Sequence, residues 1–166
     1  MSTLEVKAIQ APSGFDLVMP AGAVIQTVQN ASATQFTTNS TSEIDVTGMT
    51  ITITPKFASS KILLWFQCGT EANGGINGLG IKLYRGSTVV KENGQYSYPS
   101  TSGWNAGIAG FNYLYMDSPN TTSATTYKLQ MGTESGGTAL LGGQYNNGSS
   151  YNVSTASSIT LLEIGA

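Results

Sequence analysis

The stretch Val46-Thr-Gly-Met-Thr-Ile-Thr-Ile-Thr54 sets the fold class, because its apolar and polar residues alternate with a period of two. Met49, Ile51 and Ile53 fall on one face of an extended chain, and threonines occupy the other face. Pro55 follows directly, and it lacks the N–H that a further ladder hydrogen bond would need. The stretch therefore predicts a β-strand that buries one face and ends before Pro55.

Short segments of the same kind recur along the chain, separated by Gly, Pro, Asn and Ser. No window shows the apolar spacing of a helix over three turns. The sequence therefore predicts an all-β protein. The strand candidates besides 46–54 are 23–29, 62–66, 78–85, 88–91, 106–116, 125–131 and 158–164, with weaker ones at 138–145 and 151–155.

Three of these segments indicate where the core lies. Residues 62–66 are apolar on both faces, which predicts a central strand covered on both sides. Cys68 is the single cysteine, and we expect it to be a small buried hydrophobe. The other residues expected to point inward are Leu79, Ile81, Leu83, Tyr127, Leu129 and Met131.

Strands at this spacing favour an antiparallel β-sandwich, here expected to be of the jelly-roll type. Residues 30–45 and 92–103 are polar and are predicted to form the long loops that cross between its two sheets. Residues 21–166 form the head domain in this interpretation.

Residues 1–20 form a separate N-terminal arm in this interpretation, with two brief strands around a turn at 11–14. The arm is too short to bury a core of its own. It is expected either to pack on a partner or neighbouring subunit or to lie as an edge hairpin on the head. The apolar residues available for anchoring it are Leu4, Val6, Ile9, Phe15 and Leu17.

The composition argues against several classes of function. The chain has no His, one Cys, 7 basic and 9 acidic residues. Without His, neither a Ser–His nor a Cys–His nucleophile can be built, and the usual zinc sites are excluded. The net charge of −2 gives no basic patch for nucleic acid, and no apolar run is long enough to insert into a membrane. We therefore expect a protein that is not an enzyme and that needs no cofactor.

Carboxylates are the remaining catalytic candidates. Glu43 and Asp45 lie close in sequence, but inside a segment predicted to be a polar loop, where a solvated pair is expected. Distant carboxylates could converge to the spacing of roughly 5–10 Å that a glycoside hydrolase uses, and that class stays as the weakest alternative. A calcium site that uses Asp45 or Asp117 with loop carbonyls is a further alternative without support of its own.

Two uncharged loops contain aromatic residues, and these are the candidate contact residues. Tyr and Trp side chains beside Asn and Ser suit a sugar ring or a protein epitope, because their flat apolar faces stack while the amides form hydrogen bonds. The alternative is that the rings fold back to close the end of the sandwich or fill a subunit interface. The residues are Tyr96, Tyr98 and Trp104 in the first loop, and Tyr145 and Tyr151 in the second.

Three stretches resemble virion structural proteins of marine tailed bacteriophages, including cyanophages. Residues 117–130, Asp-Ser-Pro-Asn-Thr-Thr-Ser-Ala-Thr-Thr-Tyr-Lys-Leu-Gln, resemble a segment that those proteins often carry as DSPxTTSATTYKxQ. Residues 156–165 resemble their closing strand. Residues 20–29, with 51–56 and 59–63, are similar to their opening. Residues 2–14 are similar to the start of many phage fibre-like proteins. The segments 70–105 and 132–152 carry no such resemblance, as variable surface regions often do not.

The resemblance implies a virion location after synthesis in the host cytoplasm. It implies a small tail fibre or knob that forms a homotrimer, binds other virion proteins of the tail or capsid, and contacts a host cell-surface glycan. A capsid decoration protein or head fibre is the alternative within this class. A carbohydrate-binding module unrelated to virions is the alternative from another class.

Overall fold

The computed structural model describes residues 20–73, 78–96, 108–133, 137–142 and 156–166. All regular structure in these ranges is β-strand, which confirms the all-β class. The ten strands are β1 (Val24–Ser32), β2 (Phe36–Thr38), β3 (Ile44–Ile53), β4 (Lys61–Asn73), β5 (Gly78–Arg85), β6 (Thr88–Tyr96), β7 (Ile108–Asp117), β8 (Thr125–Thr133), β9 (Thr138–Leu141) and β10 (Ser157–Ile164).

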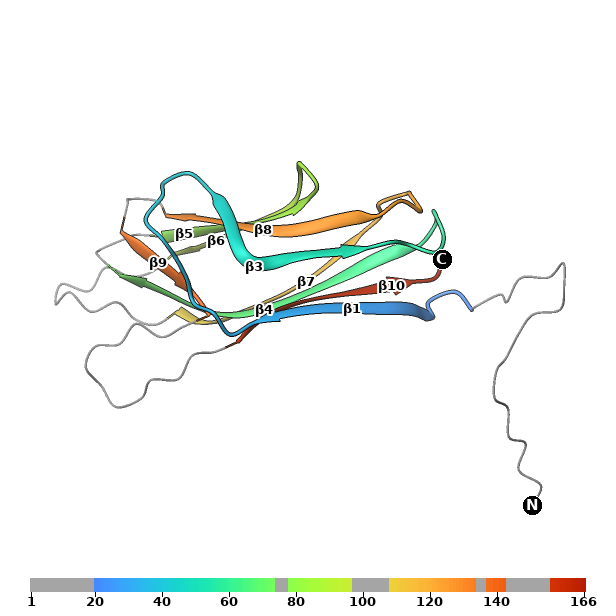
Figure 1. The fold of residues 1–166 in the computed structure, drawn as a ribbon, viewed down its shortest axis with the longest axis horizontal. Helices are drawn as coiled ribbons and strands as arrows, with labels where there is room; N and C mark the ends of the chain where they lie inside the picture. The colour runs from blue at the N-terminus through green and yellow to red at the C-terminus, as the bar shows by residue number, and fades with distance from the viewer. Residues whose placement is uncertain (1–19, 74–77, 97–107, 134–136, 143–155) are drawn as a thin grey trace, which may run out of the picture.

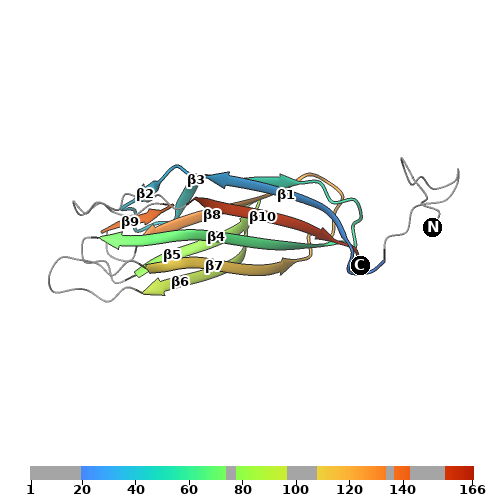
Figure 2. The ribbon, with the colours of Figure 1, turned by 90° about the horizontal axis from the view of Figure 1, so that it is seen from below.

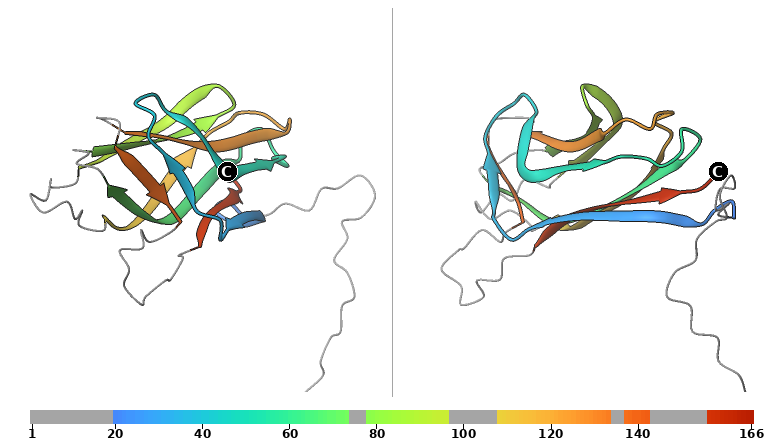
Figure 3. Two further views of the ribbon diagram at one scale, coloured as in Figure 1. Left: turned by 60° about the vertical axis from the view of Figure 1, so that its left-hand side comes forward. Right: turned by 45° about the vertical axis from the view of Figure 1, so that its right-hand side comes forward.

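The strands form two antiparallel sheets that pack face to face (Figures 1 and 3). The first sheet has the order β1-β10-β4, with β7 on the other side of β4 and with β9 and β2 continuing beside the far end of β4. The second sheet has the order β3-β8-β5-β6. This arrangement confirms the β-sandwich. The jelly-roll type stays a prediction, which is favoured by the repeated crossing of the chain between the two sheets.

The two long loops were predicted too long. Strand β1 continues to Ser32 because its polar residues pair with β10, and β2 pairs with β9 inside the segment predicted to be a loop. Strand β6 likewise continues to Tyr96, because it pairs with β5 along its whole length. Polar residues do not break these strands, since alternate positions of a sheet face solvent.

The core lies between the sheets and contains the residues that the alternation predicted. Met49, Ile51 and Ile53 of β3 are no more than 8% exposed, and Cys68 is 2% exposed. The inward residues of β5 and β8 are also confirmed as buried: Leu79, Ile81, Leu83, Tyr127, Leu129 and Met131. A period of two therefore predicts correctly which face of β3, β5 and β8 is buried.

Strand β4 is central, as predicted, but no second layer of described strands covers its outer face. It pairs with β10 on one side and with β7 on the other. Its inner residues Leu64 and Phe66 are buried, whereas Trp65 on the outer face is 45% exposed. The second sheet packs on the inner face of β4. Contact with that sheet therefore does not explain why the residues on the outer face are also apolar.

One edge of the sandwich is closed by side-chain amides. The Gln26 Nε2 of β1 donates to the Thr54 carbonyl at 2.7 Å, and the Asn30 Nδ2 donates to the carbonyls of Gly48 and Thr50 at 2.8 and 3.0 Å. These bonds join the first sheet to β3 of the second. At the opposite edge, β7 pairs with β4 alone among the described strands.

The sandwich has two distinct ends (Figures 1 and 2). We call one the clasp end: it contains the connections 54–60, 86–87 and 118–124, the start of β1 and the C-terminal Ala166. We call the other the loop end, because the strands that flank 74–77, 97–107, 134–136 and 143–155 all stop there. The register confirms this, since Gly78 lies opposite Tyr96, and Thr70 lies opposite both Ile108 and Leu141.

Candidate functional site

The predicted contact residues belong to two segments that leave the same end of the sandwich. Tyr98 and Trp104 fall in 97–107, and Tyr145 and Tyr151 fall in 143–155, so these four lie outside the described residues. Tyr96 is the last residue of β6, and its side chain is also outside the description. The strand ends that flank both segments lie at the loop end. The two aromatic loops, separate in sequence, are therefore anchored side by side.

The segments anchored at the loop end share an unusual composition. The four segments 74–77, 97–107, 134–136 and 143–155 contain a single charged residue, Glu134. The remainder is Gly, Ser, Thr, Asn, Gln, Tyr and a few apolar residues. Such residues offer hydrogen-bonding groups and aromatic faces for stacking, without a strong electrostatic field.

The described chain begins at the opposite end, where residues 1–20, the predicted arm, join the sandwich. The anchoring candidates Leu4, Val6, Ile9, Phe15 and Leu17 lie outside the described residues. The described chain begins with a turn in which the Ala23 N–H donates to the Pro20 carbonyl at 3.0 Å. Gly22 has a φ of 83° in this turn, a conformation that favours glycine.

Two backbone hydrogen bonds tie this turn to the C-terminus. The Gly22 N–H donates to the Gly165 carbonyl at 2.8 Å, and the Gly165 N–H donates to the Ala23 carbonyl at 2.9 Å. The arm therefore leaves from a fixed point at the clasp end, beside the end of β10.

A buried carboxylate holds the clasp end together. Glu163 of β10 is fully buried, and its Oε2 accepts a hydrogen bond from Gln26 Nε2 at 2.5 Å. Its Oε1 accepts from the backbone N–H groups of Lys56 and Phe57 at 2.7 and 3.3 Å. Burial alone would raise the pKa of Glu163, but hydrogen bonds, including these, outweigh burial and lower it. The ionised side chain thus fixes the 54–60 connection against β1 and β10.

A second buried carboxylate joins the two sheets at the same end. Asp117, the last residue of β7, is 6% exposed. Its Oδ1 and Oδ2 accept hydrogen bonds from Arg85 Nη1 at 2.8 and 2.7 Å, and its Oδ2 also accepts from the Tyr127 hydroxyl at 2.7 Å. Burial raises the pKa of Tyr127, and the hydrogen bond to Asp117 raises it further. Every oxygen of this carboxylate therefore has a partner from the second sheet.

The segment that carries the phage resemblance closes on itself through this bond. Asp117 begins the segment and Tyr127 lies near its end. Between them the chain reverses through a turn in which Asn120 has a φ of 53°, a conformation that Asn tolerates better than most residues. We interpret this part of the segment as a structural connection, not as a contact site.

The paired acidic residues Glu43 and Asp45 are each held by a different lysine. Glu43 Oε1 lies 2.9 Å from Lys82 Nζ, and Asp45 Oδ1 lies 2.8 Å from Lys128 Nζ. The hydrogen bond with Lys82 is the largest influence on Glu43 and lowers its pKa, and Lys128 lowers the pKa of Asp45 in the same way. Asp45 lies in β3, so the prediction of a loop pair was wrong for that residue.

The described residues contain neither a metal-binding cluster nor a membrane-spanning helix. Those residues contain no cluster of three or more acidic, Cys or His side chains that could hold a metal ion. Nor do they include a helix long and apolar enough to cross a membrane.

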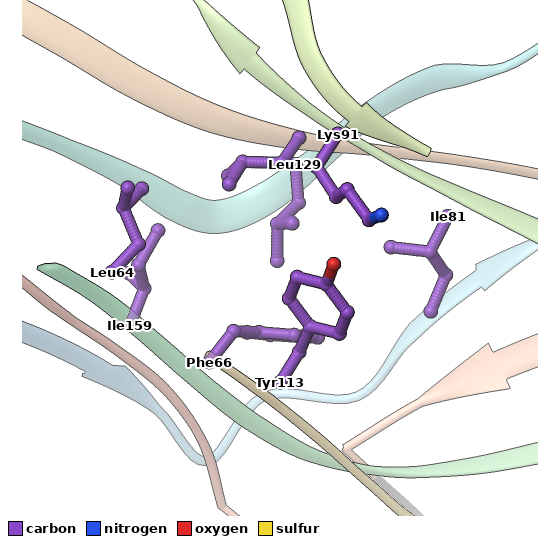
Figure 4. Close-up of a pocket in the computed structure, with 8 residues that line it drawn as sticks. Leu64, Phe66, Ile81, Lys91, Tyr113, Leu129 and Ile159 are labelled. Carbon is purple, nitrogen blue, oxygen red and sulfur yellow. The ribbon is translucent and has the colours of Figure 1, made fainter. Parts of the chain in front are cut away.

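A small cavity opens between the sheets near the β6–β7 edge (Figure 4). Its volume of about 20 Å³ is room for roughly one water molecule. Lys91 and Tyr113 place the polar atoms on its lining, with Lys91 Nζ 5.8 Å from the centre of the Tyr113 ring. Sites for organic ligands are usually more than ten times larger, so we assign no ligand to this cavity.

Sequence analysis missed an exposed apolar surface on the outer face of the first sheet. We call it the apolar face. Its most exposed members are Leu114, Met116 and Trp65, which are 59%, 44% and 45% exposed. Leu63 and Leu162 lie beside them and are partly exposed. The signal in the sequence was that 62–66 is apolar on both faces.

No protein-family model matches the sequence, and no curated protein matches it. Solved structures to which this chain is similar include infectious bursal disease virus Gx strain, at 15% identity and a TM-score of 0.43, covering 97% of this chain and 43% of that chain. The VP2 subviral particle of infectious bursal disease virus has 15% identity and a TM-score of 0.40, covering 96% and 46%.

Latent PorU from Porphyromonas gingivalis is another solved structure with a similar fold, at 12% identity and a TM-score of 0.40, covering 88% of this chain and 14% of that chain. The chain thus spans less than half the length of each of these proteins. Viral particle proteins are among the proteins to which this chain is similar in structure.

Proposed function

We propose that the chain is a phage virion structural protein, a small tail fibre or knob that attaches at its clasp end and contacts the host surface at its loop end. One observation carries the proposal. The chain leaves toward the arm at one end of the sandwich, whereas both aromatic loops are anchored at the other end. A protein that must join a particle and reach away from it needs these two functions at opposite ends.

The clasp end suits attachment because it is mechanically well supported. Glu163 ties the 54–60 connection to β1 and β10, and backbone hydrogen bonds tie Gly22 to Gly165. Asp117 joins the two sheets nearby. A load applied through the arm therefore reaches both sheets through buried, charge-assisted hydrogen bonds.

The loop end suits recognition of a neutral, hydroxyl-rich surface. Its segments combine Tyr and Trp with Asn, Ser and Thr and contain only one charge. Host cell-surface glycans match this chemistry, because sugar rings stack on aromatic faces and their hydroxyls bond to amides. The loops are thus the proposed site of adhesion, with Tyr96, Tyr98, Trp104, Tyr145 and Tyr151 as its contact residues.

The proposed mechanism is assembly and adhesion without turnover. Among the described residues, Glu43, Asp45, Asp117 and Glu163 each have a partner that holds the carboxylate in place. Low charge favours symmetric self-assembly, and we propose a homotrimer in the virion, made in the host cytoplasm. A capsid decoration protein or head fibre would use the same geometry and would differ in where the arm binds.

The proposal is tested by changing each end separately. The first experiment concerns the N-terminal arm. One variant replaces its apolar anchoring candidates with Ser: Leu4, Val6, Ile9, Phe15 and Leu17. A matched control replaces the polar residues Glu5, Lys7 and Gln10 with Ser. We expect the first variant to fold but to be lost from purified particles, while the control is incorporated. Normal incorporation of the first variant would contradict attachment through the arm.

In the second part, Trp104→Ala is compared with Phe57→Ala, an exposed aromatic residue of the clasp end. We expect Trp104→Ala to weaken host-cell or glycan binding by about 1–3 kcal/mol with little change in melting temperature. The control should bind normally. Unchanged binding with a fold destabilised by about 3–5 kcal/mol would mean that Trp104 closes the sandwich end. Binding to a purified glycan without any virion association would favour the carbohydrate-binding module.

A further inference from the structure

We propose that the apolar face is the surface on which a second copy of this chain packs. The inference deepens the proposed function, because it names the interface through which the copies assemble. It uses neither the arm nor the aromatic loops. It rests on the outer positions of four neighbouring strands, β1, β10, β4 and β7 (Figure 2).

The strand register gathers the apolar residues into adjoining rows. Trp65 of β4 lies opposite Leu114 of β7, and Leu63 lies opposite Met116. On the other side of β4, Leu63 lies opposite Leu162 of β10. These side chains therefore form one continuous patch across three strands, since directly opposed residues of a sheet point to the same face.

The most prominent ring in the patch is held in place. Trp65 Nε1 donates a hydrogen bond to Asn112 Oδ1 at 2.9 Å, across the β4–β7 pair. A fixed aromatic side chain loses little freedom when a partner covers it, and Trp is among the commonest anchors of protein interfaces. A contiguous apolar patch with a polar rim is also typical of a protein contact.

The charge pattern of the face points to a copy of the same chain. Among the outward positions whose side chains the structure describes, Lys61 is the only charged residue, and it lies at the clasp end. In a symmetric assembly like residues often meet like, so charges near the centre would repel. The other outward positions are Thr27, Gln29, Ala31, Asn112, Leu114, Met116, Ser158, Thr160, Leu162, Ile164, Leu63, Trp65 and Gln67.

The edge of the sheet supports the same partner. Strand β7 pairs with β4 alone among the described strands, so one side of its backbone has no strand beside it. Long edge strands with apolar residues are rarely left uncovered in a stable protein. A neighbouring copy seated on the apolar face would cover this edge as well. The opposite edge of the sheet is already joined to β3 by Gln26 and Asn30.

The test compares two exposed apolar positions that receive the same charge. Leu114→Glu places a carboxylate at the most exposed residue of the apolar face, and Val89→Glu places one on β6 of the other sheet, at a position that is 37% exposed. Mass photometry and sedimentation velocity of the full chain report its oligomeric state. We expect an oligomer for the wild type and for Val89→Glu, and a dissociation constant raised at least about 30-fold for Leu114→Glu.

Several outcomes would overturn the inference. These are a monomeric wild type at micromolar concentration, a natively folded Leu114→Glu variant that stays oligomeric, and equal dissociation of both variants. A monomer that binds a glycan through Trp65 would also overturn it.

A second measurement applies if Leu114→Glu does not fold. Trp65 and Trp104 are the two tryptophans of the chain, so Trp104→Phe leaves Trp65 as the only indole. We expect the Trp65 emission to shift to longer wavelength on dilution, in step with loss of the oligomer. An emission that does not change while the oligomer dissociates would overturn the inference.

This test and that of the proposed function can fail independently. If Leu114→Glu abolishes the oligomer but the protein still attaches to the particle through the arm, the proposal of attachment at one end and recognition at the other still stands. If the apolar face is shown to be an interface but the protein neither joins a particle nor binds a host surface, the inference about the interface stands and the proposed function is wrong.

Discussion

The clasp end and the loop end of the sandwich differ in how their described carboxylates are held. At the clasp end, two buried carboxylates each accept at least three hydrogen bonds: Glu163 from Gln26, Lys56 and Phe57, and Asp117 from Arg85 and Tyr127. Toward the loop end, the carboxylate of Glu43 is a third exposed and pairs with Lys82, which is also partly exposed. Among the described carboxylates, those of the clasp end are therefore expected to contribute more to stability than Glu43 does.

The physical reason is the cost of burying charge. A buried carboxylate stabilises the fold only when all its oxygens are paired, and removing one partner leaves the rest uncompensated. The residues around such a group are therefore strongly constrained. Exposed pairs contribute little and can be exchanged. A recognition surface that must change with its receptor is therefore best placed at an end where the ion pairs are exposed and the residues can be exchanged.

The largest expected effect is that of Asp117→Ala at the clasp end. The change leaves the guanidinium of Arg85 and the Tyr127 hydroxyl without their shared acceptor in a nearly buried site. We expect a loss of about 3–5 kcal/mol in the free energy of unfolding. Urea unfolding followed by circular dichroism measures it. Tyr127→Phe is the matched control and should cost about 1 kcal/mol. A loss below about 1 kcal/mol for Asp117→Ala would remove the distinction between the two ends.

The next effect is that of Glu163→Gln, which keeps the shape of the side chain and removes its charge. We expect a loss of about 2–3 kcal/mol, because an amide nitrogen would face the Gln26 Nε2 donor. The same group makes stability depend on pH. Its pKa is lowered in the folded protein, so its contribution is present above the ordinary glutamate pKa of about 4.3 and is lost as pH falls below it.

Thermal melts between pH 3 and pH 7 check this second prediction. The wild type should lose more stability than Glu163→Gln as the pH falls through this range. Parallel curves for the two proteins would show that Glu163 is not the group responsible.

The smallest effect is expected for Glu43→Gln near the loop end. Glu43 and Lys82 are both partly exposed, so solvent and salt screen their attraction. We expect the melting temperature to change by less than about 3 °C and the difference to shrink in 1 M salt. Differential scanning calorimetry measures both. A larger and salt-independent change would mean that the loop end is held as firmly as the clasp end.

The alternation of residues predicted most of the fold but none of its closing interactions. The period of two placed Met49, Ile81 and Tyr127 in the core, because a sheet buries every second residue. It did not predict that β2 pairs with β9, because β2 has only three residues and lies in a polar segment that resembles a loop. Nor could it predict that Asp117 meets Arg85, because that contact depends on how the two sheets pack.

The candidate surfaces were predictable to different degrees. The aromatic loops were recognised by composition, and the structure adds that their flanking strands stop at one end. The apolar face was missed, because an apolar run such as 62–66 is interpreted as a strand buried on both sides. Whether a second layer covers the outer side depends on packing and assembly, and Trp65 is exposed in the single chain.

The most direct test of the two-ended account is a cryo-electron microscopy image of the assembled particle, with this chain placed in its density. The account predicts that residue 20 and Ala166 face the particle and that the ends of β4 and β6, at Asn73 and Tyr96, face outward. The reverse orientation, or a loop end buried against the particle, would contradict it.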